Sequence, residues 1–98
     1  LRPAAPPPDP LVGGRFRKGR PAGRGDFGEV CEAVDESLGR AVALEGVPSD
    51  AAADPARRAR LLEEARSAAA LPRPEGPEVY EILELPAALV LVWSRVPR

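Results

Sequence analysis

The chain has 98 residues, enough for one domain with a small hydrophobic core. Hydrophobic residues make up 44% and charged residues 30%, and the net charge is −1, so the composition is typical of a folded protein and does not indicate binding to nucleic acid. No apolar run approaches the ~20 residues of a membrane span, and the first residues show no secretory signal pattern. Cys31 is the only cysteine and histidine is absent, so we expect a cytoplasmic domain without a disulfide or a metal site.

The N-terminal quarter of the chain divides into a tail and a basic stretch. Five prolines within the first ten residues predict that residues 1–14 form an extended, solvated tail, and residues 15–98 then form the domain. Five cations and no acid lie between positions 15 and 24, a pattern typical of a solvated face. Because apolar residues do not alternate here, this stretch predicts no clear strand.

A glycine-rich frame, G-x-G-x-x-G, follows at Gly23, Gly25 and Gly28. Glycines at this spacing let the backbone turn tightly and approach a phosphate with unshielded N–H groups. Two nucleotide-binding architectures use the frame, and a hairpin turn without a ligand also fits it. The residues that follow distinguish these possibilities.

One interpretation makes residues 26–39 a helix, because apolar residues there fall at helical spacing and Asp26 with Glu29 forms a capping box. A strand at 41–44 would then end in Glu45, where a dinucleotide-binding βαβ unit has its ribose-binding carboxylate. Such a unit needs a buried apolar strand before the glycines. Residues 15–22 cannot supply one, so we consider this interpretation the weaker one.

The preferred interpretation makes residues 29–35 and 40–47 two antiparallel strands around a turn that contains Gly39. Asp54 and Pro55 then start a helix over residues 55–71, with one apolar face. Residues 79–85 and 89–96 read as a hairpin. The predicted fold is α+β, an antiparallel sheet of four or five strands with one main helix.

In this order the motifs resemble the small lobe of a protein kinase, most similar to bacterial serine/threonine kinases of the eukaryotic type. The resemblance rests on Gly23-x-Gly25-x-Phe27-Gly28-x-Val30, then Ala33-x-Asp35, then Leu38-Gly39-Arg40-x-Val42-Ala43-Leu44. It implies an ATP site in which the glycine loop holds the phosphates, while Val30, Ala43 and the hinge at 94–96 hold the base. The implied site residues are Gly23, Gly25, Phe27, Gly28, Val30, Ala43, Glu45, Glu64, Trp93 and Val96.

Three positions of the implied site also have plainer interpretations. The glycine loop could be a turn without a ligand. Glu64 stands at the ion-pairing glutamate of the family's helix, but a solvated carboxylate is the alternative role. Trp93 stands at the gatekeeper position, where plain core packing is the alternative.

The chain departs from the family at the position where a lysine of the third strand holds the α- and β-phosphates. Glu45 stands there, and a carboxylate repels phosphate. The 98 residues also contain no His-Arg-Asp catalytic loop and no Asp-Phe-Gly metal-binding motif. We therefore expect a degenerate, pseudokinase-like or truncated small lobe, inactive alone, with weak or absent ATP binding and no metal site.

Two further expectations follow from the resemblance. Glu45 and Glu64 should approach each other as a solvated pair of carboxylates. A sheet face that a large lobe would normally cover should leave Val30, Ala43 and Val92 exposed, which would favour self-association or a protein partner. A non-catalytic interaction module is therefore the alternative function.

Overall fold

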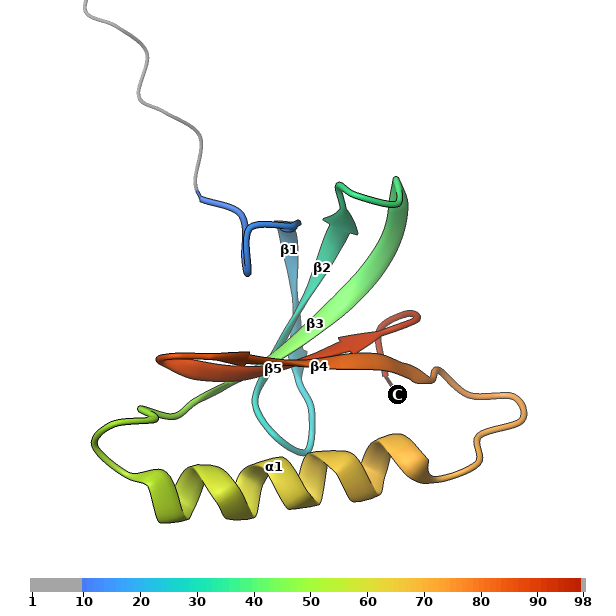
Figure 1. Cartoon of the computed structure of the whole chain (residues 1–98). Helices are drawn as coiled ribbons and strands as arrows, with labels where there is room; N and C mark the ends of the chain where they lie inside the picture. The colour runs from blue at the N-terminus through green and yellow to red at the C-terminus, as the bar shows by residue number, and fades with distance from the viewer. Residues whose placement is uncertain (1–9, 98) are drawn as a thin grey trace, which may run out of the picture.

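The computed structural model describes residues 10–97, which form one five-stranded antiparallel sheet and one helix (Figure 1). The strands are β1 (Phe16–Arg24), β2 (Glu29–Asp35), β3 (Arg40–Pro48), β4 (Val79–Leu85) and β5 (Ala88–Trp93), in the sheet order β1-β2-β3-β5-β4. The predicted α+β fold is confirmed. The dinucleotide-binding alternative is wrong, because residues 29–35 are a strand antiparallel to both of its neighbours. Of the tail predicted at 1–14, residues 1–9 lie outside the described residues. The prediction of a solvated tail is wrong at Val12, which forms backbone hydrogen bonds with Phe16 and packs against buried apolar residues of the sheet.

Strand β1 is the element that the hydrophobic pattern did not predict. Phe16 is its only fully buried residue, and Arg17 to Pro21 are all exposed. The strand forms because β2 supplies its hydrogen-bonding partner, and its register slips on both sides of Pro21. Charges, a proline and bulges along an edge strand also discourage pairing with another chain. Apart from Arg15, which is half-buried, the cationic stretch is therefore a solvated sheet edge, as the charge pattern indicated.

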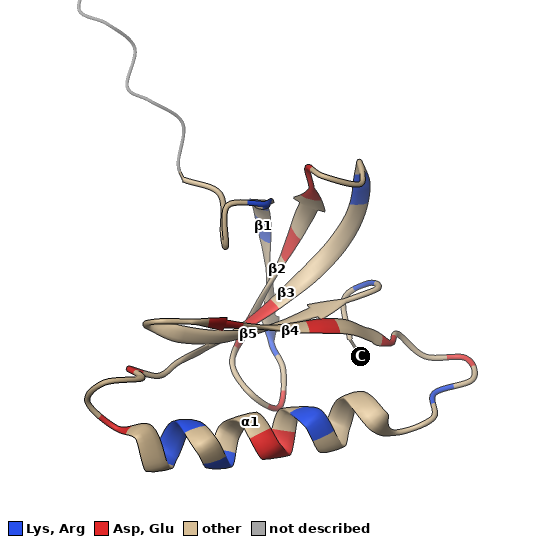
Figure 2. Cartoon of the chain, in the orientation of Figure 1, with Lys and Arg blue, Asp and Glu red and all other residues tan. Residues whose placement is uncertain are grey.

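Helix α1 (Pro55–Ala70) begins and ends where the sequence predicts, to within one residue. The Asp54 side chain accepts a hydrogen bond from the Arg57 backbone N–H at 3.0 Å, and Pro55 occupies the first turn, where a missing N–H costs nothing. Ala65 is the only fully buried residue of the helix. Figure 2 shows cations and acids interspersed along α1, which fits a helix with one face on the sheet and the rest in water.

Two apolar clusters lie on opposite faces of the sheet, because successive side chains of a strand alternate. The first cluster contains Phe16, Ala33, Val42, Leu44, Val90 and Val92. The second contains Val30, Ala43, Leu91 and Trp93 together with Ala65, so it is the face that α1 covers. Phe27 and Val96 pack against this second cluster.

The expected uncovered sheet face is not present. Val30, Ala43 and Val92 are 3%, 0% and 1% exposed, so the single chain already buries all three side chains. Phe27 and the segment after β5 help to cover Val30 and Ala43, whereas Val92 lies in the first cluster on the opposite face, so the three residues do not share one face as expected. No described helix is long and apolar enough to cross a membrane.

Candidate functional site

The glycine-rich loop joins β1 to β2 and hangs from the sheet on the side where α1 runs (Figure 1). Its backbone closes on itself through a hydrogen bond from the Gly25 N–H to the Gly28 carbonyl, at 2.8 Å. Gly23 has φ +100°, a conformation that residues with a Cβ rarely adopt. The loop therefore has a defined conformation, and Phe27 at its tip points into the cluster that contains Ala65.

Glu45 of β3 lies directly beneath this loop and is 1% exposed. Its Oε2 accepts hydrogen bonds from the backbone N–H groups of Phe27 (2.7 Å) and Gly28 (3.2 Å). Its Oε1 accepts a third from the Trp93 indole Nε1–H at 2.9 Å. No lysine or arginine in residues 10–97 forms an ion pair with Glu45, so three N–H groups alone stabilise this buried carboxylate.

Two of the three glycines of the frame are explained by how closely the loop approaches β3. A Cβ on Gly25 would overlap the Glu45 carboxylate oxygen, and a Cβ on Gly28 would overlap the Gly46 carbonyl oxygen. Glycine is therefore needed at both positions for the loop to pack on the chain's own strand. The close approach is to the Glu45 side chain at Gly25 and to the Gly46 backbone at Gly28.

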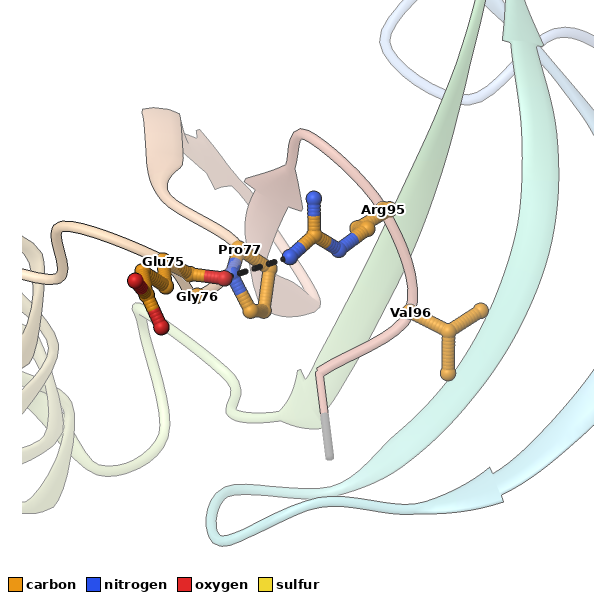
Figure 3. A pocket seen from close by; sticks show the side chains of 5 residues that line it. All are labelled: Glu75, Gly76, Pro77, Arg95 and Val96. Carbon is orange, nitrogen blue, oxygen red and sulfur yellow. Dashed lines mark hydrogen bonds between the residues drawn. The ribbon is translucent and has the colours of Figure 1, made fainter.

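The residues expected around an adenine base form part of the core. Val30 and Ala43 are buried, and Val96 packs against their cluster from the segment after β5. Val96 also lines a hollow of about 410 Å³ with Glu75, Gly76, Pro77 and Arg95, where Arg95 Nη2 donates to the Glu75 carbonyl at 2.8 Å (Figure 3). This hollow contains no residue of the glycine loop.

Comparison with known proteins finds similarity to bacterial serine/threonine kinases. Over 70 residues, 71% of its length, the chain is 44% identical to the probable serine/threonine-protein kinase SCO3848 of Streptomyces coelicolor. It is 38% identical over 74 residues to the probable serine/threonine-protein kinase PknB of Bifidobacterium longum, and 39% identical over 70 residues to the serine/threonine-protein kinase PknA of Mycobacterium tuberculosis.

The chain is similar to bacterial serine/threonine kinases over about 70% of its length, and it has a small-lobe-like α+β fold. Its matched segments cover 76% of its own length with the Bifidobacterium protein and 71% with the Mycobacterium protein. The match spans 10% of the Streptomyces protein, 11% of the Bifidobacterium protein and 16% of the Mycobacterium protein. No protein-family model matches the chain.

The expected solvated pair of Glu45 and Glu64 does not form, because Glu45 is buried. Glu64 is exposed on α1 and lines a shallow hollow with Arg60, Glu63 and Ser67, all of the same helix. Glu45 instead bonds to the loop and to Trp93. The expectation was wrong because it treated Glu45 as a solvated side chain, whereas β3 has neighbours on both sides and is buried on both faces.

Of the two roles considered for Trp93, the structure shows core packing. Trp93 is 4% exposed and belongs to the second cluster, so it packs as a core residue. Its indole N–H also donates to Glu45, which links the end of β5 to the glycine loop through one carboxylate. The guanidinium of Arg73 lies 5.0 Å from the centre of its ring.

Asp35, at the end of β2, is a second buried carboxylate whose structural role the sequence did not reveal. Its oxygens accept hydrogen bonds from Arg15 (2.8 Å), from the Ser37 N–H and hydroxyl (2.9 and 2.7 Å) and from the Leu38 N–H (3.2 Å). The Arg15 guanidinium, helped by the Ser37 and Leu38 donors, lowers the pKa of Asp35 well below its ordinary value. Arg15 also pairs with Glu81 of β4 at 2.7 Å, so this network links both edges of the sheet.

No group of three or more potential ligand side chains in residues 10–97 is arranged to hold a metal ion. The one cysteine, Cys31, is half-buried, and burial raises the pKa of its thiol. The buried polar contacts of the candidate site are those between the glycine loop, Glu45 and Trp93.

Proposed function

We propose that this kinase-like small lobe binds ATP weakly or not at all and has no phosphotransferase activity of its own. The observation that carries the proposal is the pair of hydrogen bonds from the Phe27 and Gly28 N–H groups to Glu45. In a nucleotide site, backbone N–H groups of a glycine-rich loop face phosphate oxygens. Here the Glu45 carboxylate already accepts hydrogen bonds from two of these N–H groups. Because it carries the same sign of charge as phosphate, it would repel a phosphate at the same place.

The charges around the loop support the same proposal. Phosphoryl transfer depends on cations that hold and neutralise the phosphates, and the family's strand-three lysine is one of them. Glu45 replaces that lysine, and Arg24, the nearest cation in the loop sequence, lies 3.6 Å from Glu29 in an exposed pair. No salt bridge in the described part of the chain gives Glu64 a cationic partner. At the position where the family has a lysine that attracts phosphate, the lobe therefore has Glu45, which repels it.

Calorimetric titration with Mg-ATP, together with a γ-phosphate transfer assay on a general protein substrate, tests the proposal. We expect no saturable heat up to millimolar nucleotide and no transfer. Glu64→Gln is the matched control, because it removes an exposed carboxylate on α1 and should behave like the unaltered chain. Saturable micromolar binding, or phosphate transfer that is lost in Gly25→Ala, would overturn it.

A non-catalytic interaction module is the second candidate function, and the position of α1 favours it. Only Ala65 of this helix is fully buried, while Leu61 and Leu62 are half-buried and Leu71 just beyond it is 60% exposed. These side chains leave apolar surface at which another protein could pack. Analytical ultracentrifugation over a wide concentration range tests whether the other protein is a second copy of this chain. A monomer at all concentrations would exclude self-association.

A further inference from the structure

The three donors around Glu45 form an anion-binding cradle that the chain fills with its own side chain. We propose that Glu45 acts as an internal plug for a small-oxyanion site, and that removal of its carboxylate is enough to let inorganic phosphate bind there. This inference rests on the proposed function, since it takes the loop to be closed by Glu45. Once the Glu45 carboxylate is removed, the loop would bind a small oxyanion.

The geometry of the donors supports the cradle. Two consecutive backbone N–H groups, from Phe27 and Gly28, converge on a single oxygen at 2.7 and 3.2 Å. The indole N–H of Trp93 reaches the other oxygen at 2.9 Å from a different strand. Consecutive N–H groups in a turn make a concavity that suits an anion. A third donor from another direction holds a second oxygen, so the set fits an oxyanion rather than a single atom.

The surroundings of the cradle make these donors effective. Val30, Ala43 and the Trp93 ring are buried next to it, and Phe27 packs over the same cluster. In such a low-dielectric setting a hydrogen bond to an anion is stronger than in water. Gly25 has no Cβ, and a Cβ there would occupy the space of the carboxylate oxygen. An anion that replaced the carboxylate would therefore find both the donors and the space.

The experiment compares four forms of the chain: unaltered, Glu45→Ala, Glu45→Ser and Glu45→Gln. The first two variants empty the cradle, whereas glutamine fills the same space without charge and is the matched control. Unfolding by denaturant is followed through Trp93 fluorescence in potassium phosphate and in potassium chloride of equal ionic strength. The chloride series corrects for salt effects, because phosphate also stabilises folded proteins by exclusion from their surfaces.

We expect phosphate to stabilise Glu45→Ala and Glu45→Ser selectively. At a phosphate concentration ten times its dissociation constant, the folding equilibrium of each should shift about elevenfold. The unaltered chain and Glu45→Gln should shift less than about twofold under the same conditions. The assay measures folding itself. A variant that is unfolded in potassium chloride therefore still tests the proposal, because phosphate is expected to refold it.

Amide NMR of a responding variant locates the site. On addition of phosphate, the resonances of the Phe27 and Gly28 amides and of the Trp93 indole should shift together. Stabilisation of all four forms to the same degree, no response in either truncated variant, or shifts confined to the basic strand near Lys18 and Arg20 would each overturn the proposal.

The Mg-ATP titration of the unaltered chain keeps the two proposals separate. If that chain binds no ATP and the truncated variants ignore phosphate, the proposed function stands and the cradle is wrong. If the unaltered chain binds ATP tightly, Glu45 does not close the loop, and both proposals are wrong.

Discussion

Two of the hairpin connections in the lobe, β1–β2 and β2–β3, are each organised around one buried carboxylate, and they differ in what stabilises that carboxylate. At the β2–β3 turn, Asp35 is 0% exposed and has a cation, Arg15, at 2.8 Å as well as donors from its own turn. At the β1–β2 loop, Glu45 is equally buried but has three N–H donors and no cation among the described residues. Asp35 belongs to the turn that it stabilises, whereas Glu45 reaches the loop from a different strand.

This difference separates a structural carboxylate from one that changes the chemistry of a site. The Asp35 contacts connect Arg15 with the β2–β3 turn and, through Arg15, with Glu81 of β4, and none of these residues belongs to the implied nucleotide site. Glu45 stands at the position where the resembled family has a lysine, and it accepts from the N–H groups that would otherwise face a ligand. A buried carboxylate without a cation tolerates little change, because each N–H left unpaired costs about 1–3 kcal/mol.

The largest effect is expected for Glu45→Lys. An ammonium group would face three N–H donors in a buried site, so we expect a loss of about 3–5 kcal/mol in unfolding free energy. Chemical denaturation followed by Trp93 fluorescence measures this loss. Glu64→Lys, an exposed charge reversal, is the control. A neutral or stabilising Glu45→Lys would mean that Glu45 is solvated, as the resemblance first suggested.

Gly25→Ala tests the close contact between the glycine loop and Glu45. Its Cβ would overlap the Glu45 carboxylate, so we expect a cost of about 1–3 kcal/mol. In the Glu45→Ala background the same change should cost much less, because the obstructing oxygen is gone. Denaturation of the two single variants and the double variant measures this coupling, and equal costs in both backgrounds would contradict the contact.

Asp35 should contribute to the loss of folding stability at low pH. Because its pKa is lower in the folded chain, its contribution is fully present above the unfolded pKa of about 3.9 and is lost as pH falls below that value. We expect Asp35→Asn to lower the thermal midpoint by several degrees at pH 7 and to flatten the decline between about pH 4 and pH 2. If the thermal midpoints of the two proteins fell in parallel across that pH range, the pair of Asp35 with Arg15 would contribute nothing to the pH dependence of stability.

The smallest effect is expected at Glu64. Because this carboxylate is exposed on α1, Glu64→Gln should change the unfolding free energy by less than about 0.5 kcal/mol and leave the loop unchanged. A loss above 1 kcal/mol in the same denaturation assay would indicate a partner for Glu64 that the structure does not show.

Local signals in the sequence predicted much of the fold. The Asp54–Pro55 start fixes α1, and alternation with turn residues identifies the β2–β3 and β4–β5 pairs. Strand β1 is not visible in the hydrophobic pattern because it is an edge strand that buries only Phe16 completely. Strand β5 ends at Trp93 rather than at residue 96, because the Ser94 N–H and hydroxyl bond to the backbone of Glu78 instead.

The sequence predicted the residues of the candidate site but not their arrangement. Glu45 was recognised as a departure from the family, yet its burial depends on an indole 48 positions away and on two N–H groups of the loop. Such tertiary contacts leave no periodic pattern in the sequence. A signal was nevertheless present, since Glu45 follows three apolar residues in a central strand, where a charged side chain must find buried donors.

Amide hydrogen exchange of Phe27 and Gly28 in the unaltered protein tests most directly whether Glu45 holds the glycine loop closed. Amides bonded to a buried carboxylate exchange only when the loop opens. We predict that both amides, together with the Trp93 indole N–H, exchange at rates close to those of β2 and β3 amides, and that Glu45→Ala in chloride makes all three fast. Exchange of Phe27 and Gly28 in the unaltered chain at the rate of an exposed loop amide would contradict the account.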